Sequence, residues 1–235
     1  MDDHDAASRL ALALDVPNLD AATRLIDQTR RSIGVYKIGL ELFTAVGPAA
    51  VQAVANVGAK CFLDLKIHDI PATMARTVTR ARDMGVDFLT VHGAAGEEAL
   101  SLANENAGGT RLLAVTVLTS FDDASLSKIG FRSGATEAAM TLAHVAWRAG
   151  LRGFVSSAHE CKALRDELGD DAFLVTPGIR PSGVDAGDQK RIMTPASAIA
   201  AGSSLLVVGR PIRDSDDPTA AAAALAAEVE LALQP

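Results

Sequence analysis

The chain has 235 residues and a formal net charge of −7, with 49% hydrophobic and 22% charged residues, the composition of a globular protein with a full core. The acidic balance and the lack of a basic stripe argue against nucleic acid as a partner, although a local site for a small anion remains compatible with it. No apolar run approaches the roughly 20 residues that span a bilayer, and the acidic start MDDHDAASRL resembles neither a signal nor a transit peptide. We therefore expect a soluble, cytoplasmic protein without a membrane partner.

Short apolar runs alternate with longer, Ala-rich amphipathic stretches along the whole chain. The last stretch has a well-marked start, with Asp217 as the expected N-cap and Pro218 as the first helical residue. The apolar runs predict strands at residues 10–15, 35–40, 60–66, 87–92, 112–119, 153–156, 173–176 and 204–209. The other stretches predict helices near residues 20–32, 41–56, 71–84, 95–106, 136–149, 159–168, 195–201 and 218–233.

Strict alternation of strands and helices implies parallel strands joined by right-handed crossovers. Eight such units in a chain of this length favour an α/β fold, a single-domain (β/α)8 TIM barrel over residues 1–235. An open, doubly wound sheet is the main alternative, but no GxGxxG motif follows the first strand. The longest irregular segment, residues 120–135, is rich in Ser, Gly and Asp, and we expect a lid or binding loop there.

The alternation of side chains in the first three predicted strands indicates which polar residues face the barrel interior. In the first strand the leucines face the helices, which turns Asp15 toward the barrel mouth. The same logic places Lys37 of the second strand and Asp64 and Lys66 of the third strand on the interior face. Barrel enzymes build their active sites at this mouth. Structural salt bridges are the alternative, but buried ion pairs add little stability, so we favour an active site.

Three further polar residues lie close to these strand ends. Asp69 is either a site residue or a residue that favours the start of a helix, because Pro71 is suited to the first helical position. His68 and His92 have no metal-ligand partner at a sensible spacing. A supporting role or core hydrogen bonding is therefore the expectation for both histidines.

The loops after the seventh and eighth strands predict a phosphate site, because many barrels hold phosphate there. These loops read TPGIRPSG and GRPI. Gly178 and Gly209 let the backbone approach an anion, and Arg180 and Arg210 can supply paired hydrogen-bond donors. The substrate is therefore expected to be a small phosphorylated molecule.

The segment FLDLKIHDIPAT resembles the signature of the orotidine 5′-phosphate decarboxylase family, in its bacterial short form. The resemblance covers nearly the whole chain, through LALDVPN, YKIGLELFTAVGP, TVLTSF, VTPGIRPSGVDAGDQKRIMTP and VVGRPI in that order. It implies decarboxylation of orotidine 5′-phosphate to UMP, the last step of de novo pyrimidine biosynthesis, without a cofactor or a metal. The chain departs from the family pattern at Ile67, Ala72 and residues 94–96, which bears on fine geometry only.

The resemblance also implies a role for each candidate residue. Lys66 would be the proton donor, in a catalytic array with Asp64, Lys37 and Asp69. The family's aspartate at the position of Asp69 reaches the neighbouring subunit's site, which implies a homodimer. The substrate-binding residues that it implies are Asp15, Lys37, Ile70, Thr73, Thr119, Arg180, Gln189, Gly209 and Arg210.

Two other functions remain open. A metal-dependent sugar-phosphate decarboxylase or epimerase can use the same barrel, because a DxK strand motif recurs there, and it would need a divalent cation. A non-catalytic barrel that binds a nucleotide monophosphate could dispense with Lys66 and Asp64 while it keeps Arg210 and Gln189. Both pairs are present in this chain, which favours an enzyme.

Overall fold

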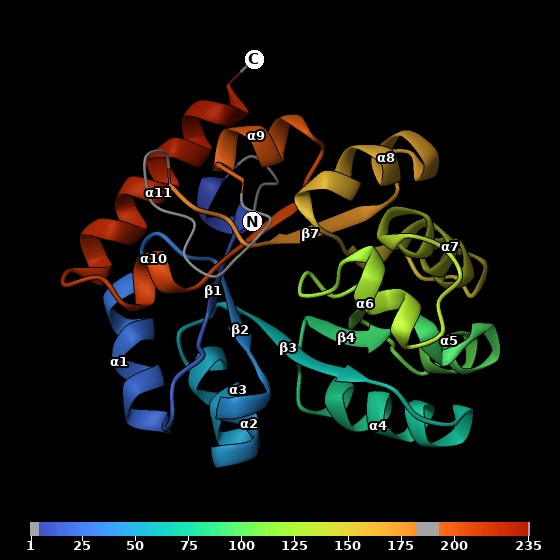
Figure 1. Ribbon diagram of the computed structural model, residues 1–235. Helices are drawn as coiled ribbons and strands as arrows, with labels where there is room; N and C mark the ends of the chain where they lie inside the picture. Colours follow the sequence, from blue (N-terminus) through green and yellow to red (C-terminus); the bar gives the residue numbers. More distant parts are fainter. Residues whose placement is uncertain (1–4, 182–192, 235) are drawn as a thin grey trace.

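The computed structural model describes residues 5–181 and 193–234, and its eight parallel strands close into a barrel in the order β1 to β8, with β8 beside β1. Helices surround the strands on the outside (Figure 1). The predicted (β/α)8 barrel is therefore confirmed. The strands are β1 (Leu10–Ala13), β2 (Val35–Ile38), β3 (Lys60–Ile67), β4 (Phe88–His92), β5 (Arg111–Val115), β6 (Gly153–Val155), β7 (Phe173–Pro177) and β8 (Leu205–Val208).

The helices begin where the sequence supplies starting signals. Asn18 caps the first helix, because its side chain accepts a hydrogen bond from the Ala21 N–H, and Asp217 caps the last helix in the same way, as predicted. The α-helices are α1 (Leu19–Thr29), α2 (Leu40–Val46), α3 (Pro48–Ala55), α4 (Pro71–Asp83), α5 (Glu97–Glu105), α6 (Asp123–Lys128), α7 (Ala135–Arg148), α8 (Ala158–Leu168), α9 (Pro195–Ala200), α10 (Arg210–Arg213) and α11 (Pro218–Leu233). Two short 3₁₀ helices are η1 (Ala6–Arg9) and η2 (Gly93–Ala95).

The core has two layers, which follow from the alternation of side chains along each strand. The leucines of β1 belong to the large apolar layer between strands and helices, whereas Ala11 and Ala13 face the interior of the barrel. Phe62 and Phe88 fill that interior and meet edge to face, with ring centroids 6.1 Å apart. The barrel interior is thus filled by apolar side chains, and the polar residues lie at the carboxyl ends of the strands.

Three predicted elements differ from the structure in their bounds or type. The single helix expected over 41–56 is two helices, because Gly47 adopts a positive φ of 61° and Pro48 begins a new helix. The segment 120–135, expected to be irregular, contains α6, whose N-cap Asp122 forms a capping box with Ser125. The fifth strand also ends at Val115 rather than at residue 119, so the loop that follows it is longer than predicted.

No helix among residues 5–181 and 193–234 is long and apolar enough to cross a membrane. Within the same ranges, no three His, Cys, Asp or Glu side chains gather as ligands of a metal ion would.

Candidate active site

Strand β3 carries the two central residues of the site, and its backbone is irregular where they lie. Leu63 pairs with Leu89 of β4, but Ile67, four residues later, pairs with Val91, only two residues after Leu89. The extra residues of β3 form a bulge. Within it Lys66 has a φ of 49°, and it is the only non-glycine residue with positive φ among the described residues. This left-handed backbone costs about 1–3 kcal/mol, and such strain is typical of functional sites.

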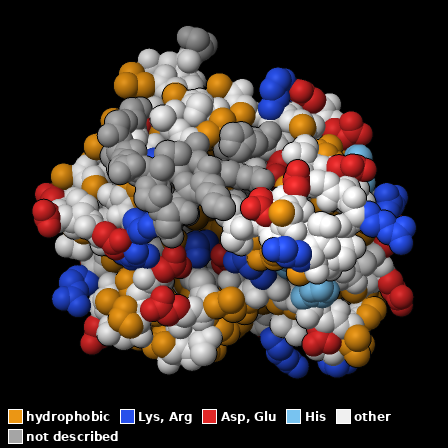
Figure 2. Space-filling model, viewed as in Figure 1, with side chains coloured by type: hydrophobic (Ala, Val, Ile, Leu, Met, Phe, Trp, Pro, Cys, Tyr) orange, Lys and Arg blue, Asp and Glu red, His pale blue; other side chains and the backbone are white. Residues whose placement is uncertain are grey.

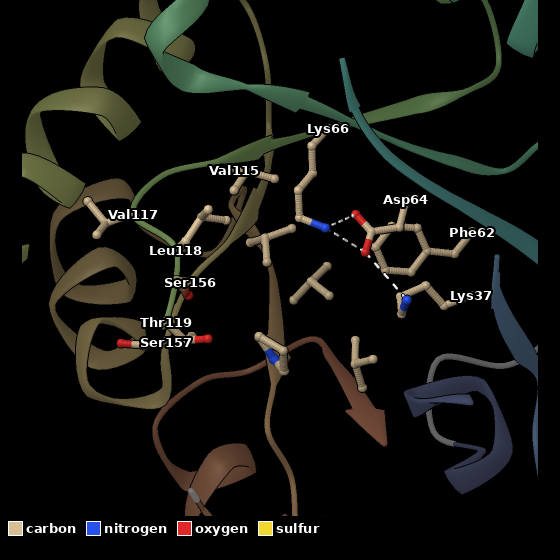
Figure 3. Close-up of a pocket in the computed structure, with 14 residues that line it drawn as sticks. Lys37, Phe62, Asp64, Lys66, Val115, Val117, Leu118, Thr119, Ser156 and Ser157 are labelled. Carbon is tan, nitrogen blue, oxygen red and sulfur yellow. Dashed lines mark hydrogen bonds and ion pairs between the residues drawn. The ribbon is translucent and has the colours of Figure 1, made fainter. Parts of the chain in front are cut away.

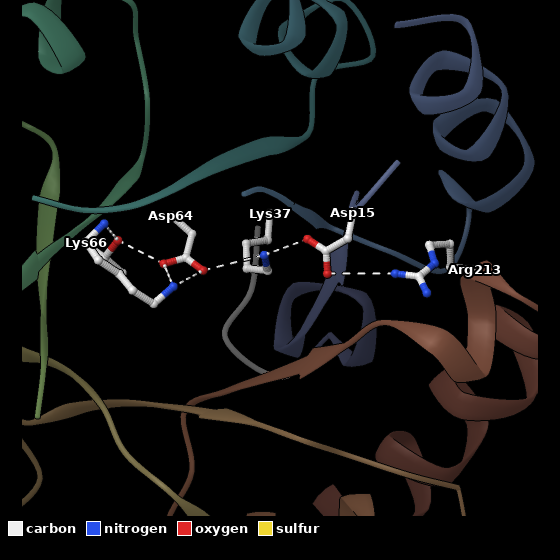
Figure 4. Close-up of polar contacts among 6 residues, drawn as sticks. Asp15, Lys37, Asp64, Lys66 and Arg213 are labelled. Carbon is white, nitrogen blue, oxygen red and sulfur yellow. Dashed lines mark hydrogen bonds and ion pairs between the residues drawn. The ribbon is translucent and has the colours of Figure 1, made fainter. Parts of the chain in front are cut away.

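Five charged side chains form a row across the barrel mouth (Figure 4). Lys66 Nζ lies 2.9 Å from both carboxylate oxygens of Asp64, and Lys37 Nζ lies 3.5 Å from Asp64 Oδ2. Lys37 Nζ also donates to Asp15 Oδ1 at 3.2 Å, and Asp15 Oδ2 lies 3.8 Å from Arg213 Nη1. The structure therefore brings together the four residues that strand alternation predicted, in alternating charge.

Arg213, at one end of the row, was not among the residues predicted from the sequence. Arg213 lies one helical turn after Arg210, and that spacing was the available signal. Gly39 leaves room for the row, because a Cβ atom there would lie 3.0 Å from Asp15 Oδ1 and 3.1 Å from Lys37 Nζ.

The row holds Asp64 as a carboxylate. Burial alone would raise the pKa of Asp64, but the charges of Lys37 and Lys66 and hydrogen bonds from Lys66 and Thr90 outweigh it and lower that pKa. The Asp64 side chain is 12% exposed, so the interaction with the two ammonium groups is only partly screened by water. An ionised carboxylate between two ammonium groups is thus the resting state of the site.

The two histidines at the edge of the row stack on each other, with ring centroids 5.4 Å apart. The pKa of His92 is lowered by burial, and also by the charges of His68 and Lys66. A long hydrogen bond of 3.5 Å joins the Ala94 N–H to His92 Nδ1. The environment beside the row therefore favours the neutral form of His92, and its supporting role stays a prediction.

A cavity of about 170 Å³ opens beside Lys66, Asp64 and Lys37 (Figure 3). Its other walls are mainly apolar, and it also contains Thr119, one of the predicted substrate residues. Ser156 lines the cavity, is 1% exposed, and its Oγ has no hydrogen-bond partner among the described residues. A flat ring with a few polar atoms suits this space. The apolar walls are formed by Val115, Val117, Leu118, Val155, Val175 and Val207.

A second cavity, of about 380 Å³, adjoins the first, because Lys37, Pro177 and Val207 line both. Three arginines line it, one from the segment after β7 and two from the short helix α10 that follows β8, so the GRPI segment that was expected to be a loop begins a helix. Two glycines, Gly178 and Gly209, expose the backbone there. Figure 2 shows basic and acidic side chains together around a hollow near the centre of this face. This cavity suits an anion, as the two loop sequences predicted. The three arginines are Arg180, Arg210 and Arg213.

Three predicted residues line neither cavity of the single chain. Asp69 Oδ1 accepts a hydrogen bond from the Ile70 N–H. Ile70 is the N-cap of α4, which begins at Pro71, and no side chain caps this helix. Ile70 is 67% exposed, and Thr73 lies in the first turn of α4. A fourth predicted residue, Gln189, lies outside the described residues.

Comparison with known proteins gives a consistent result. The model of the family described as orotidine 5′-phosphate decarboxylase / HUMPS matches residues 8–225. An orotidine 5′-phosphate decarboxylase of Rhodopseudomonas palustris (strain BisB5) is 48% identical over 94% of each chain, and one of Thermobifida fusca (strain YX) is 47% identical over 95% of this chain and 97% of its own. The crystal structure of orotidine 5′-phosphate decarboxylase from Lactobacillus acidophilus superposes with a TM-score of 0.83 at 34% identity, over 94% of this chain and 99% of the other. The chain belongs to the orotidine 5′-phosphate decarboxylase / HUMPS family.

Proposed function

We propose that the chain decarboxylates orotidine 5′-phosphate to UMP, the last step of de novo pyrimidine biosynthesis, without a cofactor or a metal. The observation that carries this proposal is the row of alternating charges beside a ring-sized cavity that opens into an arginine-lined one. A nucleotide monophosphate has the same two parts, a flat base and a phosphate. Family membership supports the same reaction.

In the proposed mechanism the base lies in the first cavity, with its carboxylated carbon against Lys66. The bond from C6 to the carboxylate breaks, CO2 leaves, and the electron pair stays on C6. The Lys66 ammonium stabilises this charge and then transfers a proton to C6, after which solvent reprotonates the amine. Asp64 faces the departing carboxylate, and two like charges about 4 Å apart repel by roughly 4 kcal/mol at an effective dielectric of 20.

The other cavity residues would bind the remote parts of the substrate. Lys37 lines both cavities and its partner Asp15 lines the second, so this pair suits the ribose between base and phosphate. Arg180, Arg210 and the backbone at Gly209 suit the phosphate, and Gln189 would add to this grip. Ser156 and Thr119 offer hydroxyl groups to the base. Binding energy from the remote phosphate would hold the ring in place for the reaction at C6.

We further propose a homodimer in which Asp69, Ile70 and Thr73 complete the site of the neighbouring subunit. These residues follow directly on the strand that carries Lys66, yet in the single chain they line neither cavity. Ile70 is a large apolar side chain that is 67% exposed. A second copy of the chain would cover it and use Asp69 at the same time.

The test is the ultraviolet absorbance of orotidine 5′-phosphate mixed with the purified protein in the presence of a chelator. We expect conversion to UMP that the chelator does not reduce. Activity that is lost with the chelator and restored by a divalent cation would favour a metal-dependent sugar-phosphate decarboxylase or epimerase instead. Binding of UMP without any turnover of orotidine 5′-phosphate would indicate a non-catalytic nucleotide-binding barrel.

A variant tests the role of Lys66. Lys66→Ala should lose nearly all turnover while its circular dichroism spectrum and unfolding transition stay those of a folded barrel, because the ammonium acts in the transition state. A Lys66→Ala enzyme with turnover within about tenfold of the parent would remove Lys66 from the chemistry, since general acid catalysis alone contributes roughly 10²-fold or more.

A further inference from the structure

A buried threonine on β4 joins the two central residues of the charged row. Thr90 is 0% exposed and lines neither cavity, so it is not placed to touch a bound ligand. Its Oγ1 accepts a hydrogen bond from the Lys66 backbone N–H at 2.8 Å. The same hydroxyl donates to Asp64 Oδ1 at 2.9 Å. One side chain thus contacts the backbone of the proposed proton donor and the carboxylate that faces it.

The chemistry of the three groups fixes the direction of both bonds. An amide N–H can only donate, and an ionised carboxylate can only accept. A hydroxyl has one proton to give and lone pairs to receive with, so Thr90 must receive from Lys66 and give to Asp64. A side chain of the same shape without the hydroxyl would leave the Lys66 N–H and one Asp64 contact unmatched.

The backbone of Lys66 is where such support is needed. Lys66 has a left-handed φ of 49° at the bulge of β3, where the regular pairing of β3 with β4 is interrupted between Leu63 and Ile67. Its side chain returns to Asp64, with Nζ 2.9 Å from both oxygens. The contacts therefore close a ring from the Lys66 backbone through Thr90 and Asp64 to the Lys66 ammonium.

We propose that Thr90 is a positioning residue for decarboxylation, which holds Lys66 in its left-handed conformation and aligns Asp64 with the Lys66 ammonium. This inference rests on the proposed function, because it assigns a role to Thr90 through the two residues placed in that chemistry. The Thr90 hydroxyl is buried and lines neither cavity, so it does not occupy space that the substrate would need.

The environment of Asp64 predicts an effect on pH dependence. Asp64 is faced by Lys37 from β2, by Lys66 from its own strand, and by the Thr90 hydroxyl from β4, with Asp15 of the β1 end beyond Lys37 and His92 beyond Lys66. Burial would raise the pKa of Asp64, and the two lysines and the Thr90 hydroxyl lower it. Removing the hydroxyl should therefore raise the pKa of Asp64. As the pH is lowered, Asp64 would be protonated sooner, and activity would begin to fall at a higher pH than in wild type.

The experiment compares Thr90→Val with Thr90→Ser in the full-length protein. Thr90→Val keeps the shape and loses the hydroxyl, and we expect kcat to fall by roughly tenfold to a hundredfold with KM changed by less than about threefold, because positioning is lost and binding is not. The acid limb of the pH profile should move to higher pH. Thr90→Ser restores the hydroxyl and should return kcat to within about threefold of wild type.

Thr110→Val is the matched control. Thr110 is also buried, and its hydroxyl donates to the Val86 carbonyl at 2.9 Å, away from the charged row. Thr110→Val removes a buried hydroxyl that makes one hydrogen bond, whereas Thr90→Val removes one that makes two, and we expect Thr110→Val to leave kcat and the pH profile unchanged. Amide hydrogen exchange adds a readout apart from activity: the Lys66 N–H should exchange faster in Thr90→Val than in wild type or Thr110→Val.

Wild-type kcat, pH profile and Lys66 exchange in Thr90→Val would overturn the inference and leave the proposed function intact. An inactive wild-type protein would instead count against the proposed function itself. If Thr90→Val does not fold, Thr90→Cys replaces it, since a thiol is close to serine in size but a weak donor and acceptor. Equal kcat in Thr90→Cys and Thr90→Ser would then refute the role of the hydroxyl.

Discussion

At the scale of single residues, Asp64 shows how the site and the stability of the fold are linked. Its carboxylate accepts from Lys66 and Thr90 and lies 3.5 Å from the Lys37 ammonium. Without that charge, two ammonium groups would face each other at the barrel mouth. The same carboxylate is proposed to lie against the leaving group, so one residue both neutralises the resting site and strains the substrate complex.

Stability should depend on pH through Asp64. The folded protein holds the pKa of Asp64 below its ordinary value of about 3.9, so the ionised carboxylate stabilises the fold above that pH, and this contribution is lost as the pH falls through the lower, folded pKa. We expect Asp64→Asn to reduce the free energy of unfolding by about 3 kcal/mol at pH 7, because it leaves two ammonium groups partly buried without their counter-charge.

Urea unfolding of wild type and Asp64→Asn from pH 7 down to pH 3 measures this effect. The difference in the free energy of unfolding between the two proteins should be constant near neutral pH and should shrink below about pH 4. A difference that grows as the pH falls would show that Asp64 is easier to protonate in the folded protein, which contradicts the structure's electrostatics.

The charged residues of the row can be predicted from the sequence, whereas the role of Thr90 cannot. Asp15, Lys37, Asp64 and Lys66 are charged residues on faces that are otherwise apolar, which makes them visible from alternation alone. Thr90 also follows the alternation, two residues after Phe88 on β4, but a threonine is an ordinary strand residue. Its role depends on the bulge of β3, a backbone irregularity with no signature in the sequence.

At the scale of elements, the segment after β5 is better ordered than its composition suggested. Leu126 of α6 is 1% exposed and packs in a small apolar cluster with residues of α7 and with Val117. Asp123 of α6 also accepts a hydrogen bond from the Ala135 N–H at the start of α7. The turn residues did not indicate α6, because a helix of six residues with a single buried face gives only a weak periodic signal.

Leu126→Ala tests whether this cluster supports the site. A buried leucine replaced by alanine costs about 2–5 kcal/mol, and here the loss should fall on the local opening of residues 117–142 rather than on the whole barrel. We expect faster amide exchange in that segment and a lower kcat/KM, because Val117, Leu118 and Thr119 line the ring-sized cavity. Leu231→Ala, at a leucine that is 68% exposed, is the control, and equal exchange and kinetics in the two variants would contradict this role.

At the scale of the whole molecule, the fold was the most predictable property. Eight apolar runs separated by amphipathic stretches leave few arrangements other than a closed parallel barrel, and the position of the site at the strand ends follows from that closure. Assembly is different, because it depends on which exposed surfaces match those of a second copy. Residues such as Leu40 and Ile70 are exposed in the single chain, and no periodicity in the sequence indicates what covers them.

The proposal that Asp69 of one subunit completes the site of the other can be tested by mixing two inactive variants. Lys66→Ala and Asp69→Ala each damage every site of their own homodimers, but a hybrid dimer has one site with an intact Lys66 from one chain and an intact Asp69 from the other. If subunits exchange freely in an equal mixture, half of the dimers are hybrids, and about a quarter of wild-type activity should return. The double variant Lys66→Ala/Asp69→Ala, mixed with Lys66→Ala, is the control and should restore nothing. If Asp69 instead acted in the site of its own chain, every site of a hybrid dimer would carry one of the two substitutions. The first mixture would then be as inactive as its components, which would contradict the proposal.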